Sequence, residues 1–242
     1  MSIKILEIAV NSYPSAKEAF EGGADRIELF SGYFDGGLTP SYSLVKKIAE
    51  DFSYPIMVMI RAREGDFNYS DEEIEIMIND ILLFKKLNIF GFVFGILDNE
   101  NKVDKQKNTL LLEAAYPFPC TFHRAFDFTI DPLEALQDCI ALGFTRILSS
   151  GQESNCIEGI DLLNELKIAA KGKIIILPGA GVNSKNIIEL AEKTGAKEFH
   201  ATAKKLMGIG MGLGIKKELG KILEFTQSDA EEIKRIKENL NN

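Results

Sequence analysis

Eight short apolar runs, separated by longer stretches of helical periodicity, constrain the fold of this chain more than any other feature. The runs are rich in β-branched and other apolar residues, as is typical of buried strands. Strands joined by helices must run parallel, so eight such units favour an α/β fold closed into a (β/α)₈ TIM barrel over an open doubly wound sheet. The predicted strands span residues 4–10, 26–30, 55–61, 91–96, 120–125, 146–150, 173–179 and 198–202.

Capping residues mark helix boundaries between the predicted strands. Ser70 and Glu73 form a capping box at the start of residues 70–88, where apolar side chains recur at helical spacing. A second helix is predicted between Asp131, a candidate N-cap followed by proline, and Gly143, a glycine stop. These signals support the alternation of strand and helix that a barrel requires.

The chain is expected to form a single domain with a C-terminal extension. Its 242 residues fall in the usual size range of one barrel, and no linker or low-complexity region divides them. We assign the barrel to residues 1–205. A glycine-rich connection and a charged helix follow, so residues 206–242 are predicted to form a helical extension that packs on or beside the barrel.

Composition excludes several classes of function. The net charge is -8, from 28 basic and 36 acidic residues, which argues against broad nucleic-acid binding. We find no run of about 18 apolar residues and no signal peptide, so we expect a cytoplasmic protein without a membrane partner. The three cysteines form no CxxC pattern and are expected to be reduced, buried thiols. A small molecule or a metal ion is therefore the expected ligand.

Charged side chains within the predicted strands point to the interior of the barrel. Because strand residues alternate between the interior and the helix layer, such side chains must face inward or lie near a strand end. Burying an unpaired charge is costly, so these groups must pair with one another or reach a wet pocket. For any one of them, the alternative is a structural ion pair that plugs the barrel. The inward set consists of Glu7, Arg26, Glu28, Arg61, His123, Glu198 and His200.

The carboxyl ends of the strands are the expected site, because active sites of this fold lie there. We expect His123 or His200 to act as general acid or base near neutral pH. Glu28 or Glu198 would orient the imidazole or act as a second proton-transfer group. The predicted catalytic residues are Glu28, Arg61, His123, Glu198 and His200.

Guanidinium groups and glycine amides are the expected anion-binding groups on the same rim. Arg61 and Arg124 would hold a carboxylate or a phosphate by bidentate contacts. Arg124 points the other way along its strand from His123, so it is also expected to pair with Asp127 or a neighbouring loop. The predicted ligand-binding or phosphate-binding residues are Arg26, Arg124, Ser149, Gly179 and Gly181.

Two glycine-containing loops complete the rim. Residues 177–186 end the seventh strand in a turn that is predicted to open a helix at Asn183 or Ser184, with free amide groups at its positive end. Loops after strands seven and eight commonly build a phosphate site in this fold, although the glycines would also serve chain reversal alone. Residues 31–41, after the second strand, are predicted to form a mobile lid that leads into a capped helix.

Several motifs, taken in order, resemble those of the CutC family, which is described as a family of copper homeostasis proteins. The resemblance covers residues 3–205. It implies a role in copper homeostasis and copper binding, in a cytoplasmic (β/α)₈ barrel that forms a homodimer. The motifs are "GGADRIEL", "GGLTPS", "MIRAREGDFNYSD", "GFVFGIL", "TFHRAFD", "LSSG", "PGAGV" and "EFHATA".

The copper ligands implied by the resemblance are incomplete in this sequence. Relatives often carry cysteine at places that match Ala9 and Phe30, and both thiols are absent here. Cuprous copper prefers soft thiolate or thioether ligands. Cys120 and His123 remain as candidate metal ligands, together with two methionines of the third strand.

Two other functions stay open. One alternative is an enzyme of lyase or isomerase type that acts on a small anionic metabolite, phosphorylated or not. If the protein instead binds copper or another transition metal without turnover, the ligands would be His123, His200, Glu28 and Glu198, a set that suits zinc, manganese or iron better than cuprous copper. The other alternative is a barrel that serves as an interaction scaffold.

Overall fold

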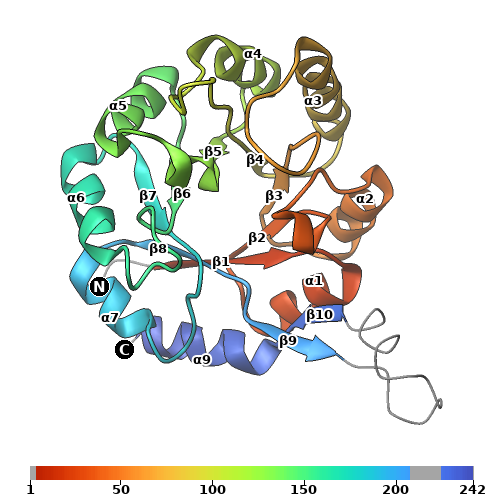
Figure 1. Ribbon diagram of the computed structural model, residues 1–242. Helices are drawn as coiled ribbons and strands as arrows, with labels where there is room; N and C mark the ends of the chain where they lie inside the picture. The colour runs from red at the N-terminus through yellow and green to blue at the C-terminus, as the bar shows by residue number, and fades with distance from the viewer. Residues whose placement is uncertain (1–3, 208–224, 242) are drawn as a thin grey trace, which may run out of the picture.

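A computed structural model describes residues 4–207 and 225–241 of the chain. Eight parallel strands form one sheet in the order β7-β6-β5-β4-β3-β2-β1-β8. Because β7 also lies beside β8, the sheet curls into a nearly closed barrel with the helices outside (Figure 1). The predicted (β/α)₈ barrel and all eight predicted strands are confirmed. The strands are β1 Ile5–Val10, β2 Arg26–Leu29, β3 Ile56–Met59, β4 Gly91–Phe94, β5 Cys120–Phe122, β6 Arg146–Ser149, β7 Ile175–Pro178 and β8 Glu198–Ala201.

The helices begin where the sequence supplies capping side chains. Ser70 and Glu73 make the predicted capping box of α3. Asp131 accepts hydrogen bonds at the start of α5, and Gly143 ends that helix at a φ of 90°. Short 3₁₀ turns, η1 Tyr33–Asp35 and η2 Arg124–Phe128, lie in loops after strands. The helices are α1 Tyr13–Glu21, α2 Tyr42–Asp51, α3 Asp71–Phe84, α4 Lys105–Ala115, α5 Pro132–Leu142, α6 Ile160–Ala170, α7 Ile187–Thr194 and α9 Ala230–Asn241.

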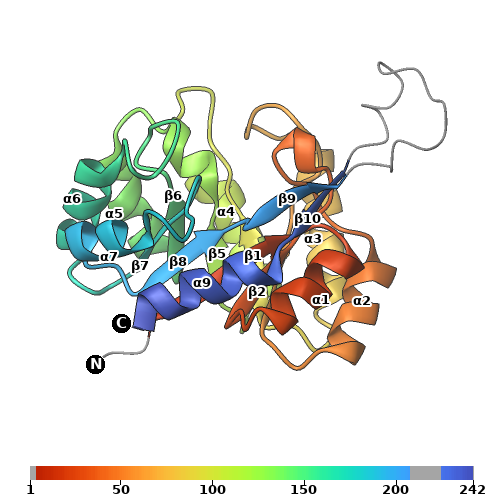
Figure 2. The same cartoon turned by 90° about the horizontal axis from the view of Figure 1, so that it is seen from below.

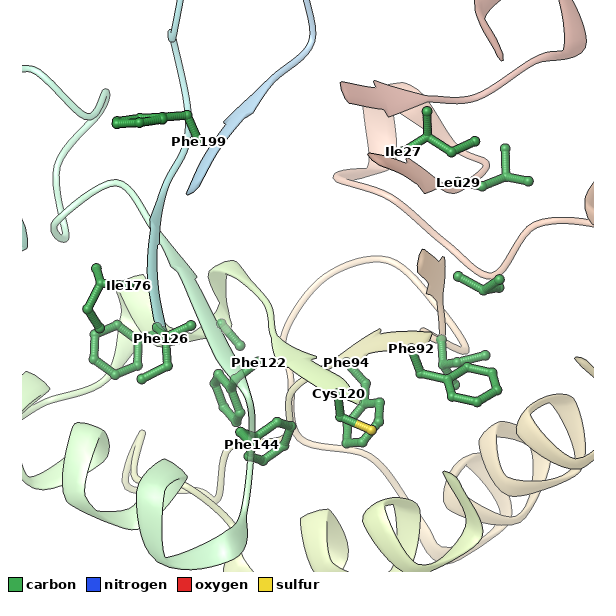
Figure 3. Close-up of a cluster of buried hydrophobic side chains, with 14 of the residues drawn as sticks. Ile27, Leu29, Phe92, Phe94, Cys120, Phe122, Phe126, Phe144, Ile176 and Phe199 are labelled. Carbon is green, nitrogen blue, oxygen red and sulfur yellow. The ribbon is translucent and has the colours of Figure 1, made fainter. Parts of the chain in front are cut away.

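The main hydrophobic core lies between the strands and the helix layer. Cys120 and Phe122 of β5 both belong to this core, in keeping with the alternation along a strand. Phe144 packs against Phe122 and Phe94, with ring centroids 5.2 and 5.4 Å away (Figure 3). Each fully buried aromatic side chain of this kind contributes about 1.5–3 kcal/mol to stability. This outer core leaves the barrel interior to the opposite faces of the strands.

Polar and charged side chains occupy that interior because the strand register brings them together. Glu7 of β1 pairs with Arg26 of β2 and with His200 of β8. Ala9 lies opposite Glu28, and Ile5 lies opposite Glu198. The register therefore places several groups of the predicted inward set side by side, and the members of that set are all buried.

The extension closes the ring of helices. Strands β9 Lys204–Met207 and β10 Phe225–Ser228 pair in an antiparallel fashion, and α9 packs against α1 and α7 (Figure 2). Much of the predicted glycine-rich connection lies outside the described residues. None of the helices in the described ranges is long and apolar enough to cross a membrane.

One predicted helix start is wrong. Helix α7 begins at Ile187 and not at Asn183 or Ser184, because residues 183–186 form a turn. The backbone amide of Ser184 donates a 2.7 Å hydrogen bond to the carboxylate of Glu232 in α9, and the Ser184 hydroxyl donates to the same group. An acidic side chain of the extension therefore binds an amide that the sequence suggested for an external anion.

Candidate functional site

A buried ion-pair network lies at the base of the site. Arg26 donates hydrogen bonds to Glu7 and, over 2.7 Å, to Glu198. Arg146 donates to the same Glu198 oxygen over 2.8 Å. Burial raises the pKa of Glu7, but the charges of Arg26 and His200 outweigh it and lower the pKa to about 2. Glu7 and Arg26 thus make the contacts that are expected if they form a structural ion pair inside the barrel.

Arg146 is a member of this network that the sequence analysis missed. It is 8% exposed and begins β6, with its guanidinium turned toward Glu198 of β8. The signal was present, because Arg146 alternates with the apolar Ile147 in the same way as Arg26 does with Ile27.

Glu28 and His200 adjoin the network at Glu7. His200 Nδ1 is 2.8 Å from Glu7 Oε1, and one ligand atom from each of Glu7, Glu28 and His200 lies within 4.8 Å of the others. Burial raises the pKa of Glu28 to about 7, although the charge of His200 acts in the opposite direction. Burial alone would lower the pKa of His200, but Glu28 and Glu7 raise it. The charges of these three groups therefore influence one another's titration.

Glu28 has an oxygen that the protein does not satisfy. Glu28 is 3% exposed, and its Oε2 atom has no hydrogen-bond partner among the described residues. A buried carboxyl oxygen without a partner is uncommon, because it loses its hydrogen bonds to water and gains none from the protein. Glu28 therefore has one hydrogen-bonding position that the described residues leave unfilled.

His123 presents a second open position. Its Nδ1 atom accepts a 3.2 Å hydrogen bond from the backbone amide of Ala125, so in the neutral ring the proton is on Nε2. This Nε2 atom is buried and has no partner within the part of the chain that the structure describes. Burial and the nearby charge of Arg61 lower the pKa of His123 to about 3. The imidazole is therefore neutral at physiological pH and offers one N–H donor.

Glu28, His123 and His200 meet at one cavity, which we call the inner pocket. Its volume is about 250 Å³, and it lies over the interior face of the barrel. Its wall is partly apolar and partly polar, as is usual for small-molecule sites. Besides the three titratable residues, the lining includes Phe30, Tyr33, Met59, Phe67 and Leu148.

A wider cavity, the outer cavity, adjoins the inner pocket. Its volume is about 700 Å³, and Gly36, Phe67 and Arg124 line both spaces. Arg61 lines the outer cavity, where its guanidinium lies 4.9 Å from the centre of the Phe67 ring. Two spaces that share their walls can hold two parts of one ligand.

Arg61 holds loops in place around the cavities. Its Nη1 atom donates to the carbonyls of Asp35 and Gly37, and its Nη2 atom donates to the carbonyl of Gly65. The loop of residues 31–41 is thereby tied to the end of β3. The predicted capped helix after this loop is confirmed, because Ser41 caps α2. The catalytic role of Arg61 stays a prediction.

Arg124 makes the expected pair with Asp127. Arg124 Nε donates to Asp127 over 2.7 Å, and its Nη2 donates to the Ser150 hydroxyl over 3.0 Å. Ser149 donates its hydroxyl to the other oxygen of Asp127. Asp127 therefore organises the loop after β6 around Arg124.

The structure does not gather the five predicted ligand-binding or phosphate-binding residues into one place. Only Arg124 lines the inner pocket and the outer cavity. Arg26 lies in the ion-pair network, and the hydroxyl of Ser149 is bound to Asp127. Gly179 lies against Leu148, since a Cβ at this glycine would be 2.5 Å from Leu148 Cδ1. The ligand-binding roles of these residues, including Gly181, stay predictions.

Cys120 and His123 are not brought together. Cys120 lies on the helix side of β5 (Figure 3), whereas His123 follows the strand on the interior side and lines the inner pocket. Burial raises the pKa of the Cys120 thiol to about 12. Of the two methionines proposed with them, Met59 lines the inner pocket and Met57 is fully buried beside it.

Comparisons with known proteins agree with this architecture. Residues 4–205 match the CutC family. A human protein named copper homeostasis protein cutC homolog is 44% identical over 207 residues, which are 86% of this chain and 76% of that protein. A family protein CutC from Parabacteroides distasonis is 42% identical over 96% of this chain and 98% of its own length.

Solved structures share the fold. A crystal structure described as a copper homeostasis protein CutC from Streptococcus agalactiae has a TM-score of 0.79 and 33% identity, and covers 83% of this chain and 99% of that one. A thiamine phosphate pyrophosphorylase from Pyrococcus furiosus has a TM-score of 0.61 at 14% identity, over 99% of this chain and 96% of that one. The second likeness shows a common fold alone.

Proposed function

Because the chain belongs to the CutC family, we propose that it takes part in copper homeostasis, the role for which its relatives are named, and that it acts through the inner pocket. The support is the extent of the similarity, which includes 42% identity over 96% of the chain. The observation that carries the choice of pocket is that two residues of its lining hold buried polar atoms without a hydrogen-bond partner, Glu28 Oε2 and His123 Nε2. Leaving either atom without a partner costs about 1–3 kcal/mol, so a ligand that satisfies both would recover that energy.

The residues present fit cuprous copper poorly. Among the described residues that line the inner pocket, Met59 is the one with a sulfur atom. The cluster of Glu7, Glu28 and His200 offers carboxylate and imidazole atoms, which are harder ligands. Glu7 also lies against the Arg26 guanidinium, whose positive charge opposes a second cation.

The open polar atoms favour a second candidate, an enzyme that acts on a small metabolite. A neutral imidazole donor and a carboxyl group with a pKa of about 7 are suited to proton transfer. Arg124, at the junction of the two cavities, would face an anionic part of such a metabolite. Such an enzyme would be an isomerase or a lyase.

Metal analysis and a thermal-shift screen separate the two candidates. The purified protein would be assayed for copper, zinc, manganese and iron, and then melted with each metal and with carboxylated and phosphorylated metabolites. Stoichiometric copper that His123→Ala removes supports a copper site in the inner pocket. A metabolite that raises the melting temperature of the native protein, but not of His123→Ala, supports the enzyme. Glu189→Gln, at an exposed ion pair, is the control.

The setting proposed for this function is a cytoplasmic homodimer, as the family resemblance implies. The ligand would be a small molecule or a metal ion, with no nucleic acid and no membrane as partner. The acidic net charge of -8 supports the exclusion of nucleic acid. Sedimentation of the purified protein measures the oligomeric state, and a monomer at micromolar concentration would refute the homodimer.

A further inference from the structure

We propose that the inner pocket catalyses enolisation of a hydroxylated aldehyde or ketone, by removing a proton from the carbon next to its carbonyl group. The proposal rests on the enzymatic candidate for this pocket and assigns separate roles to His123 and Glu28. Both residues line the inner pocket, both are nearly fully buried, at 4% and 3% exposure, and each has a buried polar atom with no hydrogen-bond partner among the described residues. A ligand that fills the cavity must therefore match one donor and one carboxyl group at once.

His123 supplies the donor. The hydrogen bond from the Ala125 amide occupies Nδ1, so the ring can present only an N–H at Nε2. The ring is also fixed in place, because it packs against Phe67 with centroids 5.0 Å apart. On the other side lies Gly95, where a Cβ would be 2.8 Å from Nδ1. A fixed N–H donor in a buried cavity is suited to polarise a carbonyl and to stabilise the oxyanion that forms from it.

Glu28 is the matching base. Nδ1 of the neighbouring His200 is bound to Glu7, and the remaining acidic group of the network, Glu198, is held by two arginines. Among the described residues, Glu28 is the carboxylate of this cluster with an oxygen that has no hydrogen-bond partner. It is also the carboxylate that lines the inner pocket. Glu28 is therefore the group placed to remove a proton from a ligand there.

The proposed step balances without a further reactant. The Glu28 carboxylate takes a proton from the carbon next to the carbonyl, and the electron pair of that C–H bond forms a carbon–carbon double bond. The π electrons of the carbonyl move to its oxygen, which becomes an enolate oxygen that accepts a hydrogen bond from His123 Nε2. Return of the proton from Glu28 to the original carbon regenerates the carboxylate and the starting compound. Return of the proton to the former carbonyl carbon, with transfer of the neighbouring hydroxyl's proton to the enolate oxygen, regenerates the carboxylate and gives the isomer.

The outer cavity indicates the class of substrate. Its wall carries short carboxylate and amide side chains beside aromatic rings, and one of these rings, Phe128, is 60% exposed. Such groups bind hydroxyls through hydrogen bonds and C–H groups through ring faces. The polar side chains include Asp66, Asn68, Asp98 and Asn99. A polyhydroxylated chain with its carbonyl end in the inner pocket fits this arrangement, and Arg124 at the junction would accommodate a phosphate on it.

Proton exchange with solvent tests the step whatever the final product is. The protein would be incubated in D₂O with dihydroxyacetone, D-erythrulose, D-ribulose and D-ribulose 5-phosphate, and deuterium on the carbon next to the carbonyl would be measured by NMR. We expect incorporation with at least one probe, and a loss of about 100-fold or more in Glu28→Gln. Exchange with the unphosphorylated sugars would show that hydroxyls suffice, and exchange with the phosphate ester alone would show that the outer cavity needs an anion.

Variants distinguish the roles of the residues. His123→Ala should also lose about 100-fold, and Gly95→Ala, which retains both groups but displaces the imidazole, should lower kcat more than it changes KM. Glu189→Gln should exchange as the native protein does. If circular dichroism shows that Glu28→Gln is unfolded, the test rests on Gly95→Ala. A lower kcat in this variant than in the native protein would then support the proposal, and an unchanged kcat would contradict it.

Two results would overturn the proposal: no incorporation with any probe, or incorporation that Glu28→Gln leaves unchanged. If incorporation is absent while a metal or a metabolite still protects the protein through His123, enolisation is refuted and the proposed function of the pocket stands. If neither protection nor exchange is found, both proposals fail.

Discussion

Arg61 Nη1 donates a 3.0 Å hydrogen bond to the carbonyl of Gly37, a residue that lines the inner pocket. A side chain at the end of β3 thus fixes one wall of a cavity that the loop after β2 helps to form. The same guanidinium holds the carbonyls of Asp35 and Gly65, so a single residue joins two loops.

Replacing Arg61 tests this link. Arg61→Ala should speed amide hydrogen exchange in residues 31–38 and lower the free energy of unfolding by about 1.5–3 kcal/mol, because several bonds to a charged donor are lost. Arg63→Ala is a matched control, since Arg63 binds the carbonyls of the neighbouring loop at Glu64 and Asn68. The assigned role of Arg61 is wrong if exchange in residues 31–38 is the same in both variants.

Removing Arg26 should destabilise the protein strongly. Arg26→Met leaves the buried carboxylates of Glu7 and Glu198 without one of their partners, and we expect unfolding in urea to be easier by about 3–5 kcal/mol. Lys193→Met breaks the exposed pair with Glu189 and should cost far less, because solvent screens that pair. A loss below about 1 kcal/mol in Arg26→Met would mean that the network carries little stability.

His123 should make stability depend on pH. Its pKa is about 3 in the folded protein and 6.5 when unperturbed. The unfolded chain therefore binds a proton that the folded chain does not, and stability falls as the pH decreases from 6.5 toward 3. The slope from this one group approaches about 1.4 kcal/mol per pH unit.

Unfolding curves at several pH values measure this contribution. His123→Asn should remove the part of the pH dependence that comes from the imidazole. Acid-sensitive groups such as Glu7, whose pKa is lowered, remain in both proteins. The difference between the native protein and His123→Asn isolates the imidazole. Parallel curves from pH 4 to 6.5 would contradict a buried neutral His123.

The three cysteines should be inert in the folded protein. Burial raises the pKa of the Cys120 thiol to about 12 and that of Cys156 to about 11, and it also raises the pKa of Cys139. The thiolate is the reactive form, so Ellman's reagent at pH 8 should modify these residues slowly until a denaturant is added. Rapid modification of the native protein would contradict the buried placement of these thiols.

A copper titration of Cys120→Val complements the thiol assay. The thiol lies in the helix-side core, so whatever amount of copper the native protein binds, the variant should bind the same amount. His123→Ala provides the opposite control, because it changes the wall of the inner pocket. Loss of copper in Cys120→Val with His123→Ala unaffected would place a copper site outside that pocket.

The strands and the inward set could be predicted from sequence because both follow from local periodicity. Alternation within a strand of four residues decides which face Arg26 and Glu28 share, whatever the rest of the chain does. Helix starts with a side-chain cap, such as Ser70, are equally local. These signals do not depend on the neighbouring strand.

Pairing within the site could not be predicted, because it depends on register and on loops. The sequence shows that Glu7 and His200 face inward, but only the pairing of β1 with β8 makes them partners. The carbonyl partners of Arg61 come from two loops whose paths are set by tertiary contacts. The start of α7 was predicted too early for the same reason. The turn before this helix is bound by Glu232 of α9, a helix that is far away in the sequence but packs against α7.

Helix α9 occupies the seam between the first and the seventh helix, and at Gly22 it comes so close to α1 that a Cβ there would lie 2.7 Å from Ile233 Cβ. During synthesis on the ribosome, the strands and helices up to α7 leave the exit tunnel before α9 does. Until α9 emerges, the nascent barrel exposes apolar surface along this seam. The outer layer of helices is therefore completed late in translation. Chaperones and proteases would meet the chain before that layer is complete.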